Sequence, residues 1–184
     1  MASNFAIRLA AHHVRQGDVI AYPTDTVYGL GCDPLNTAAL VYLNSLKNRP
    51  PGKGLILLAS SIDQLADYIE LHDTDSRKRL SAEPSPTSWI VPANKHLPDV
   101  LTGGADTVAV RITQSTVVRT LCEHLGHPLV SSSANPGGRP PALNSLQLHR
   151  WFHGRIASIL IDDGAGTGKP STLKHIHTQH IYRE

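Results

Sequence analysis

The chain has 184 residues, the size of one ordinary domain with room for a substantial apolar core. Hydrophobic residues make up 40% and charged residues 17%, a balance that excludes a disordered chain. The net charge of +2 does not indicate a nucleic-acid binder, and two cysteines are too few for a disulfide framework.

The start of the chain lacks the apolar core of a signal peptide, and no stretch reaches the roughly 18 apolar residues that a membrane helix needs. Two widely separated cysteines fit a reducing compartment. We therefore expect a single domain over residues 1–184 that works in the cytoplasm and has no membrane partner.

Apolar spacing and turn residues divide the chain into predicted elements. In chain order these are a helix capped by Ser3 or Asn4 and ended by Gly17, a strand over 19–23, a helix over 37–47, a strand over 55–59, a helix beginning at Ser60 or Ser61, strands over 88–93 and 107–112, a helix over 115–125, a strand over 128–133, a helix over 144–152, and strands over 157–162 and 178–184. Strands mixed with helices predict an α/β fold whose sheet is covered on both faces.

Two patterns that suggest ligand sites fail on inspection. "DDGAGTGKPST" (162–172) resembles a P-loop, but Asp163 stands where the first glycine belongs and Pro170 follows Lys169. Histidines recur on the predicted helix over 144–152 and near the end of the chain, but no matching carboxylate or thiol completes a zinc set. We expect neither a P-loop nor a protein-held metal.

The segment "KNRPPGK" (47–53) places three cations and two prolines before a buried strand. Lys47 and Arg49 also fit the C-terminal end of a helix, where cations meet the negative end of the dipole. That explanation does not extend to Lys53, at the mouth of the strand. A rigid cationic loop at a strand end suits phosphate groups, since little entropy remains to be lost on binding.

Other strand ends also carry polar groups. "YPTDTVYGLG" supplies two threonines and Asp25 after one strand, "SSSANPGGRPP" supplies three serines and Asn135 after another, and Arg111 lies near the end of "TVAVRI". Ligands of open α/β sheets bind where such ends converge. These segments together predict a shared polar site.

With "LKNRP" and "KGLILLA", these motifs stand in the order typical of the YrdC family, the bacterial threonylcarbamoyl-AMP synthases, and the resemblance covers about residues 15 to 183. It implies a three-layer α/β fold with a twisted mixed sheet around a positively charged cavity. It also implies an enzyme that joins L-threonine, bicarbonate and ATP into L-threonylcarbamoyl-AMP and diphosphate. A transferase complex then passes the threonylcarbamoyl group to adenosine 37 of tRNAs reading codons that begin with A.

The resemblance also implies roles for individual residues. They are catalysis by Lys47 and Arg49, ATP binding by Arg49, Lys53, Thr107, Asn135 and Arg183, and threonine binding by Thr26, Arg111, Ser133 and Ser171. Arg111 would pair with the carboxylate of threonine, because its planar donors fit two oxygens. Mg²⁺ is expected on the phosphates, held largely by ATP and water.

The chain departs from the family pattern at two places. Relatives usually have Trp-Pro-Gly-Pro-x-Thr before a strand, and residues 83–88 here read "EPSPTS", so Ser88 replaces the threonine. Leu58 or Ala59 stands where some relatives have a substrate-contacting histidine.

Two other functions remain open from the residues. A basic concavity could bind tRNA or rRNA, weakly or as the main function, although the chain has few aromatic residues for base stacking. A sugar-phosphate enzyme resembling dihydroxybutanone-phosphate synthase would need an acidic cluster that these loops lack. Threonine-dependent diphosphate release would separate the three.

Overall fold

Nine strands form one mixed sheet in the computed structural model, which describes residues 2–162 and 166–183. In chain order they are β1 (Ile20–Tyr22), β2 (Gly29–Gly31), β3 (Ile56–Ala59), β4 (Thr87–Pro92), β5 (Thr107–Ile112), β6 (Leu129–Ser133), β7 (Ser158–Ile159), β8 (Thr172–His175) and β9 (Ile181–Arg183). Their order across the sheet is β7-β1-β2-β6-β3-β5-β4-β8-β9. The central β3 runs parallel to β5 and antiparallel to β6.

Helices surround the sheet: α1 (Asn4–Arg15), α2 (Thr37–Leu46), α3 (Thr74–Ala82), α4 (Asp99–Thr102), α5 (Thr116–Leu125) and α6 (Ser145–Phe152). The local sequence fixes where several of these helices begin, because a side-chain oxygen at the N-cap accepts a hydrogen bond from a free backbone N–H of the first turn. Ser3 Oγ accepts from Ala6 N at 3.2 Å, and Asn36 Oδ1 accepts from Ala39 N at 3.0 Å. The predicted cap of the first helix at Ser3 is therefore confirmed.

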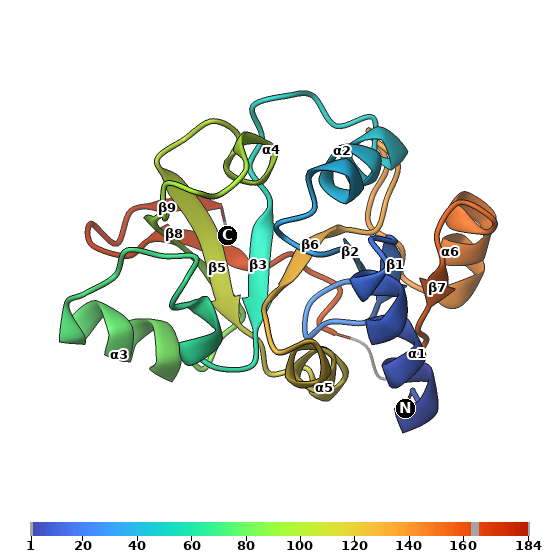
Figure 1. The fold of residues 1–184 in the computed structure, drawn as a ribbon, viewed down its shortest axis with the longest axis horizontal. Helices are drawn as coiled ribbons and strands as arrows, with labels where there is room; N and C mark the ends of the chain where they lie inside the picture. The colour runs from blue at the N-terminus through green and yellow to red at the C-terminus, as the bar shows by residue number, and fades with distance from the viewer. Residues whose placement is uncertain (1, 163–165, 184) are drawn as a thin grey trace.

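The sheet separates two apolar clusters, because successive side chains of a strand point to opposite faces. On β3, Leu58 packs into a cluster with α1 and α5, whereas Leu57 packs into the larger cluster with α2, α4 and α6. Figure 1 shows α1 and α5 together below the strands and α2 and α4 above them. The expected three-layer α/β fold is confirmed.

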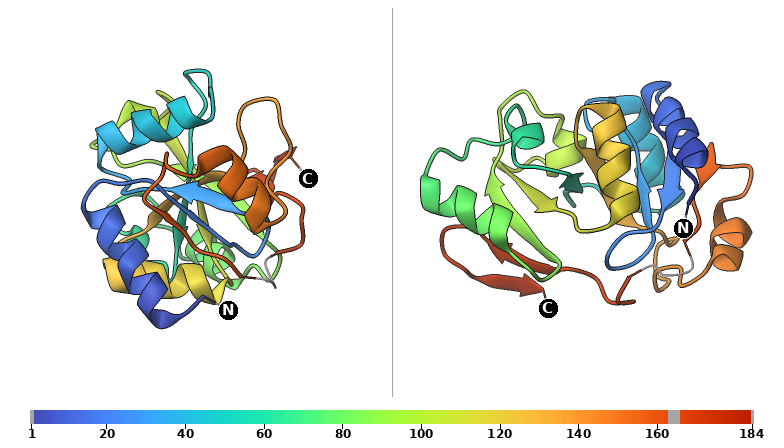
Figure 2. Two further views of the ribbon diagram at one scale, coloured as in Figure 1. Left: turned by 90° about the vertical axis from the view of Figure 1, so that its right-hand side faces the viewer. Right: turned by 90° about the horizontal axis from the view of Figure 1, so that it is seen from below.

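The segment 166–183 carries β8 and β9, and in the right-hand view of Figure 2 it runs along the bottom of the molecule, away from α1, α2 and α5 at the top. It is tied to the loop after β1, where Thr167 N donates to Asp25 O at 3.3 Å and Gly168 N donates to Thr26 O at 2.9 Å. A Cβ at Gly166 would lie 2.1 Å from Thr26 O, so this close approach requires glycine.

Some sequence predictions fail. The helix expected from Ser60 or Ser61 is only a 3₁₀ turn, η1 (Asp63–Leu65). Beyond it, backbone groups turn to the end of β4, with Glu70 N donating to Pro92 O at 3.0 Å, and this pairing replaces the hydrogen bonds of a helix. Four elements were not predicted: β2, α3, α4 and β8.

The strand β8 follows Lys169 and Pro170, whereas a P-loop would continue into a helix there, so the structure agrees with the exclusion of a P-loop. Asp163, which also counted against a P-loop, lies outside the described residues.

Candidate active site

One cavity brings together six of the predicted site residues from distant parts of the chain. It is lined by Thr26, Arg49, Arg111, Ser133, Ser171 and Arg183, among others. No aspartate or glutamate of residues 2–162 and 166–183 lines it. The polar part of its wall therefore consists of guanidinium, hydroxyl and backbone groups, beside apolar residues such as Leu55 and Ile56, and a positive charge of the cavity as a whole stays a prediction.

The side chains reach the cavity because polar residues occupy one face of the central strands. On β5, Val108 and Val110 pack into the larger apolar cluster, so Arg111 projects to the other face. On β6, Val130 packs into that cluster, and Ser131 and Ser133 line the cavity. The alternation of strand residues thus sets a polar patch beside the apolar face that α5 covers.

The turn at residues 24–26 forms the threonine-rich wall. Thr24 Oγ1 donates to Val27 O at 2.7 Å and lies 2.9 Å from Thr26 Oγ1. The single hydroxyl proton of Thr24 is used by Val27, so Thr26 is the donor between the two hydroxyls. Arg111 Nη1 donates to Thr26 Oγ1 at 3.4 Å. The turn therefore directs the hydroxyl proton of Thr26 to Thr24 and leaves a lone pair of Thr26 Oγ1 as the acceptor for Arg111.

Arg111 is deeply buried and paired. Its Nη2 lies 3.0 Å from Asp25 Oδ1, and the two side chains are 5% and 13% exposed. Burial lowers the pKa of Arg111, while the carboxylate of Asp25 and then Tyr22 act to raise it. Arginine stays protonated under all ordinary conditions, so the site holds a fixed cation at this wall.

Arg49, which is half-buried, and Arg183, which is exposed, form a wall of a different kind. Arg49 Nη2 donates to Gly54 O at 2.7 Å, and Arg183 Nη2 donates to Ser171 O at 2.9 Å. Burial lowers the pKa of both guanidinium groups, and the charge of Arg183 further lowers that of Arg49. Among the described residues neither forms an ion pair, so this pair of like charges is suited to an anion.

Lys47 does not line this cavity, but it holds a loop that does. Its ammonium donates to the backbone oxygen and hydroxyl of Ser133, the latter at 3.4 Å, and to O and Oδ1 of Asn135, both at 3.1 Å. Only 4% of Lys47 is exposed. Burial, and to a smaller extent the charge of Arg49, lowers the pKa of Lys47 to about 8. The structure thus favours a clamping contact for Lys47 over a direct contact with ligand.

Ser171 is positioned from two sides. Its hydroxyl lies 2.9 Å from that of Ser88 on β4 and accepts from Arg183 Nη2 at 3.3 Å. Ser88 is fully buried. The hydroxyl that replaces the usual threonine of the family therefore still has a partner, and this contact links β4 to Arg183.

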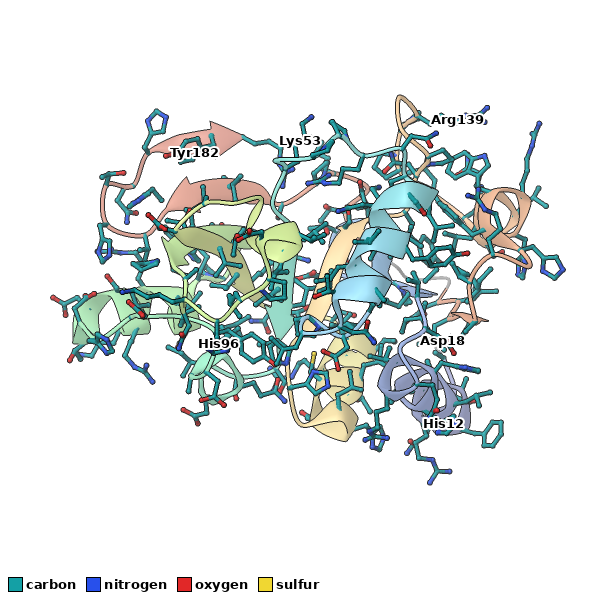
Figure 3. All side chains as sticks on the ribbon, turned by 45° about the horizontal axis from the view of Figure 1, so that its top comes forward. His12, Asp18, Lys53, His96, Arg139 and Tyr182 are labelled. Carbon is teal, nitrogen blue, oxygen red and sulfur yellow. The ribbon has the colours of Figure 1, made fainter. Side chains whose placement is uncertain are left out.

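Three predicted ligand-binding residues lie around the cavity without lining it. Lys53 is exposed at the edge of the molecule (Figure 3) and lines a neighbouring groove that shares Arg49. Thr107 lines another groove, which shares Gly54 with the cavity. Asn135 accepts the Ser133 hydroxyl at 2.6 Å and donates to Arg139 O at 2.6 Å, so its amide is used within its own loop.

Sequence reasoning assigned no individual role to several polar residues of the site. Thr24, Ser131 and Ser132 line the cavity, and Asp25 pairs with Arg111. Strand alternation could have indicated that Ser131 and Ser133, the first and third serines of "SSS", share a face. Nothing local indicates the Asp25–Arg111 pair, because its members lie far apart in the chain.

The residues present do not fit a metal held by the protein. No carboxylate lines the cavity within the described residues, and no three His, Cys, Asp or Glu of that part of the chain gather into a metal-binding group. Hard cations such as Mg²⁺ prefer carboxylate oxygens as ligands.

The described helices were also compared with the length and hydropathy of a membrane span. Among residues 2–162 and 166–183, none meets both requirements.

Comparisons with known proteins agree with this arrangement. A family model for Sua5, YciO and YrdC, described as "Telomere recombination", matches residues 12–184. Curated proteins of Pseudomonas putida and Pseudomonas aeruginosa, both named threonylcarbamoyl-AMP synthase, are each 44% identical over 184 residues, 100% of this chain and 99% of theirs.

Solved structures give the same result. P. abyssi Sua5 complexed with L-threonine has a TM-score of 0.85 and 33% identity over 94% of this chain and 51% of that one, so this chain spans about half the length of Sua5. E. coli YciO has a TM-score of 0.85 and 25% identity over 99% of this chain and 90% of its own. The chain belongs to the Sua5/YciO/YrdC family.

Proposed function

We propose that this protein is an L-threonylcarbamoyladenylate synthase, which condenses L-threonine, bicarbonate and ATP to L-threonylcarbamoyl-AMP and diphosphate. Two independent lines support the proposal. Full-length relatives carry the name threonylcarbamoyl-AMP synthase, and a structural relative is complexed with L-threonine. The observation that carries it in this chain is a single cavity with Arg111, paired with Asp25, at one wall and with Arg49 and Arg183, which form no ion pair among the described residues, at another.

The amino acid would bind at the Arg111 wall. The carboxylate of threonine accepts hydrogen bonds from the guanidinium of Arg111, because planar donors match two oxygens. The hydroxyls of Thr26 and Ser133 lie in the same cavity and meet the polar groups of the amino acid. Ser171 completes this set from the C-terminal segment.

The nucleotide would bind toward Arg49 and Arg183, with Lys53, Thr107 and Asn135 around the cavity. The amine of threonine adds to bicarbonate with loss of water and gives a carbamate. A carbamate oxygen then attacks the α-phosphorus of ATP, and the bond to the β-phosphate oxygen breaks, so diphosphate leaves. Such transfers depend mainly on positioning and on neutralising charge, which Arg49 and Arg183 supply.

Lys47 would contribute by holding the Ser133–Asn135 loop in place for both substrates. Mg²⁺ carried by ATP and water, use of the product by a tRNA threonylcarbamoyl transferase complex, a weak contact with tRNA and a cytoplasmic location all stay predictions.

The proposal is tested by measuring diphosphate release with all three substrates and with threonine or bicarbonate left out. We expect release only in the complete mixture, together with threonylcarbamoyl-AMP identified by mass spectrometry. Release that does not depend on threonine would contradict the proposal. Binding of RNA with steep salt dependence and no ATP turnover would favour an RNA-binding module instead.

A further inference from the structure

Asp25 compensates the most deeply buried cation of the site. Its Oδ1 lies 3.0 Å from Arg111 Nη2, and its Oδ2 accepts from Gln114 N at 3.3 Å, which fixes the carboxylate against the connection from β5 to α5. A charge removed from water is costly unless it is paired. Asp25 therefore stabilises a charged guanidinium at a depth where only 5% of the Arg111 side chain is exposed.

Two nitrogens of the Arg111 guanidinium contact neighbouring side chains, and the third has no hydrogen-bond partner among the described residues. Nη2 faces Asp25, and Nη1 donates to Thr26 Oγ1 at 3.4 Å. Within the described ranges 2–162 and 166–183, Arg111 Nε and Asp25 Oδ1 are both buried and neither has a hydrogen-bond partner, so Asp25 holds Nη2 as an ion pair. Arg111 also lines the cavity, whereas Asp25 does not. An arginine with unused donors beside a cavity is prepared for an anionic ligand, and its orientation is set from behind.

We propose that Asp25 is a positioning residue, which holds Arg111 so that the unused donors of its guanidinium face the carboxylate of threonine. This inference rests on the proposed function. Asp25 does not touch the substrate and acts through Arg111 alone.

The same turn also has a structural task, which must be separated from this one. The backbone oxygens of Asp25 and Thr26 accept from Thr167 and Gly168, and so hold the segment that leads to Ser171 and Arg183. A change that disturbed the backbone would weaken binding of ATP as well as threonine. A change confined to the Asp25 carboxylate leaves those backbone acceptors in place, so its effect falls on threonine.

The main test variant is Asp25→Asn, which keeps the size of the side chain and removes its charge. We expect its KM for L-threonine in diphosphate release, and its threonine Kd by calorimetry, to rise at least about tenfold, with the KM for ATP changed less than about twofold. The matched control is Asp18→Asn, which removes the charge of a half-exposed aspartate that lies 3.0 Å from His13, and we expect it to leave both constants unchanged.

The second part of the test is a double-mutant cycle with Arg111→Gln. If Asp25 acts through Arg111, Asp25→Asn weakens threonine binding in the wild type and adds nothing in the Arg111→Gln protein. Asp25→Glu, which keeps the charge but displaces it, serves in the same cycle if Asp25→Asn does not fold, and we expect a smaller loss of threonine affinity.

Unchanged threonine affinity in folded Asp25→Asn would overturn the inference, as would equal losses in the presence and absence of Arg111 or equal losses for threonine and ATP. A wild type that releases no diphosphate in response to threonine would instead contradict the proposed function. The two failures are therefore distinguishable.

Discussion

The two cationic walls of the cavity differ in how their charges are held. Arg111 is almost fully buried and paired with Asp25, whereas the half-buried Arg49 and the exposed Arg183 are neighbours that donate to backbone oxygens. A paired cation presents direction with little excess charge, which suits one carboxylate of a zwitterion. Two unpaired cations present excess charge, which suits a polyanion such as a triphosphate. The difference predicts which substrate each wall recognises.

The largest loss of activity is expected from a change at Arg49. We expect Arg49→Ala to lower kcat for diphosphate release by about 10²–10³-fold, because a charge that stabilises the departing diphosphate is lost. Threonine binding should be retained, since the Arg111 wall is intact. Calorimetry with threonine and a thermal melt provide the control, and near-normal release by a folded variant would refute the assignment.

At the other wall we expect Arg111→Ala to raise the threonine KM by about 30-fold or more, as removal of one partner of a buried charged pair costs about 2–5 kcal/mol. The KM for ATP should change little. Because Asp25 is left unpaired, the melting temperature should fall as well. A KM for ATP that rises as much as that for threonine would contradict the division of the cavity into two walls.

A pH profile of activity tests the role of Lys47, whose ammonium holds the Ser133–Asn135 loop. Its folded-state pKa of about 8 lies below the ordinary value of 10.5. As pH rises through about 8, the ammonium loses a proton and one of its hydrogen bonds to the Ser133–Asn135 loop, so activity should fall.

The sign for stability is opposite, which separates the two effects. Between about pH 8 and 10.5 the unfolded chain keeps a proton that the folded chain has lost, so this group raises the free energy of unfolding with pH. Lys47→Arg stays charged, and the activity it retains should not decline over this interval. Parallel profiles for the two proteins would exclude Lys47 as the cause.

The smallest effect is expected at Ser88, which supports Ser171 and through it Arg183. Ser88→Ala removes one buried hydrogen bond, worth about 1 kcal/mol, so we expect the KM for ATP to rise by about threefold to fivefold. Ser88→Thr, which restores the residue typical of the family, should stay near the wild type. A loss of affinity as large as that of Arg183→Ala would show that the contact does more than support.

The strands with continuous apolar or alternating patterns could be predicted from the sequence, and the others could not. β5 and β6 were located almost to the residue, because the apolar side chains that they bury are valine or leucine. β2, "GLG", reads as a turn, yet a Cβ at Gly31 would lie 2.1 Å from Val130 O, so glycine is there to allow close strand packing. α3 was missed because only Ser76 and Leu80 of it are buried.

The site shows the same division. The motifs indicated that Arg49, Arg111 and Ser133 belong together, and the structure brings them to one cavity. They could not indicate that the Lys47 ammonium turns toward Ser133 and Asn135. That contact depends on how the end of the helix α2 is placed relative to the strand β6, which no local pattern encodes.

The order of strands also has a consequence for how ligands affect the protein. β1 and β7 lie far apart in the sequence yet are neighbours in the sheet. The cavity is lined by side chains from the loop after β1, from the central strands and from β9. Contacts between such remote segments form slowly during folding, so the cavity should be completed late. A bound substrate would then fasten the beginning, middle and end of the chain together, and its protection against unfolding or proteolysis should extend across the whole sheet.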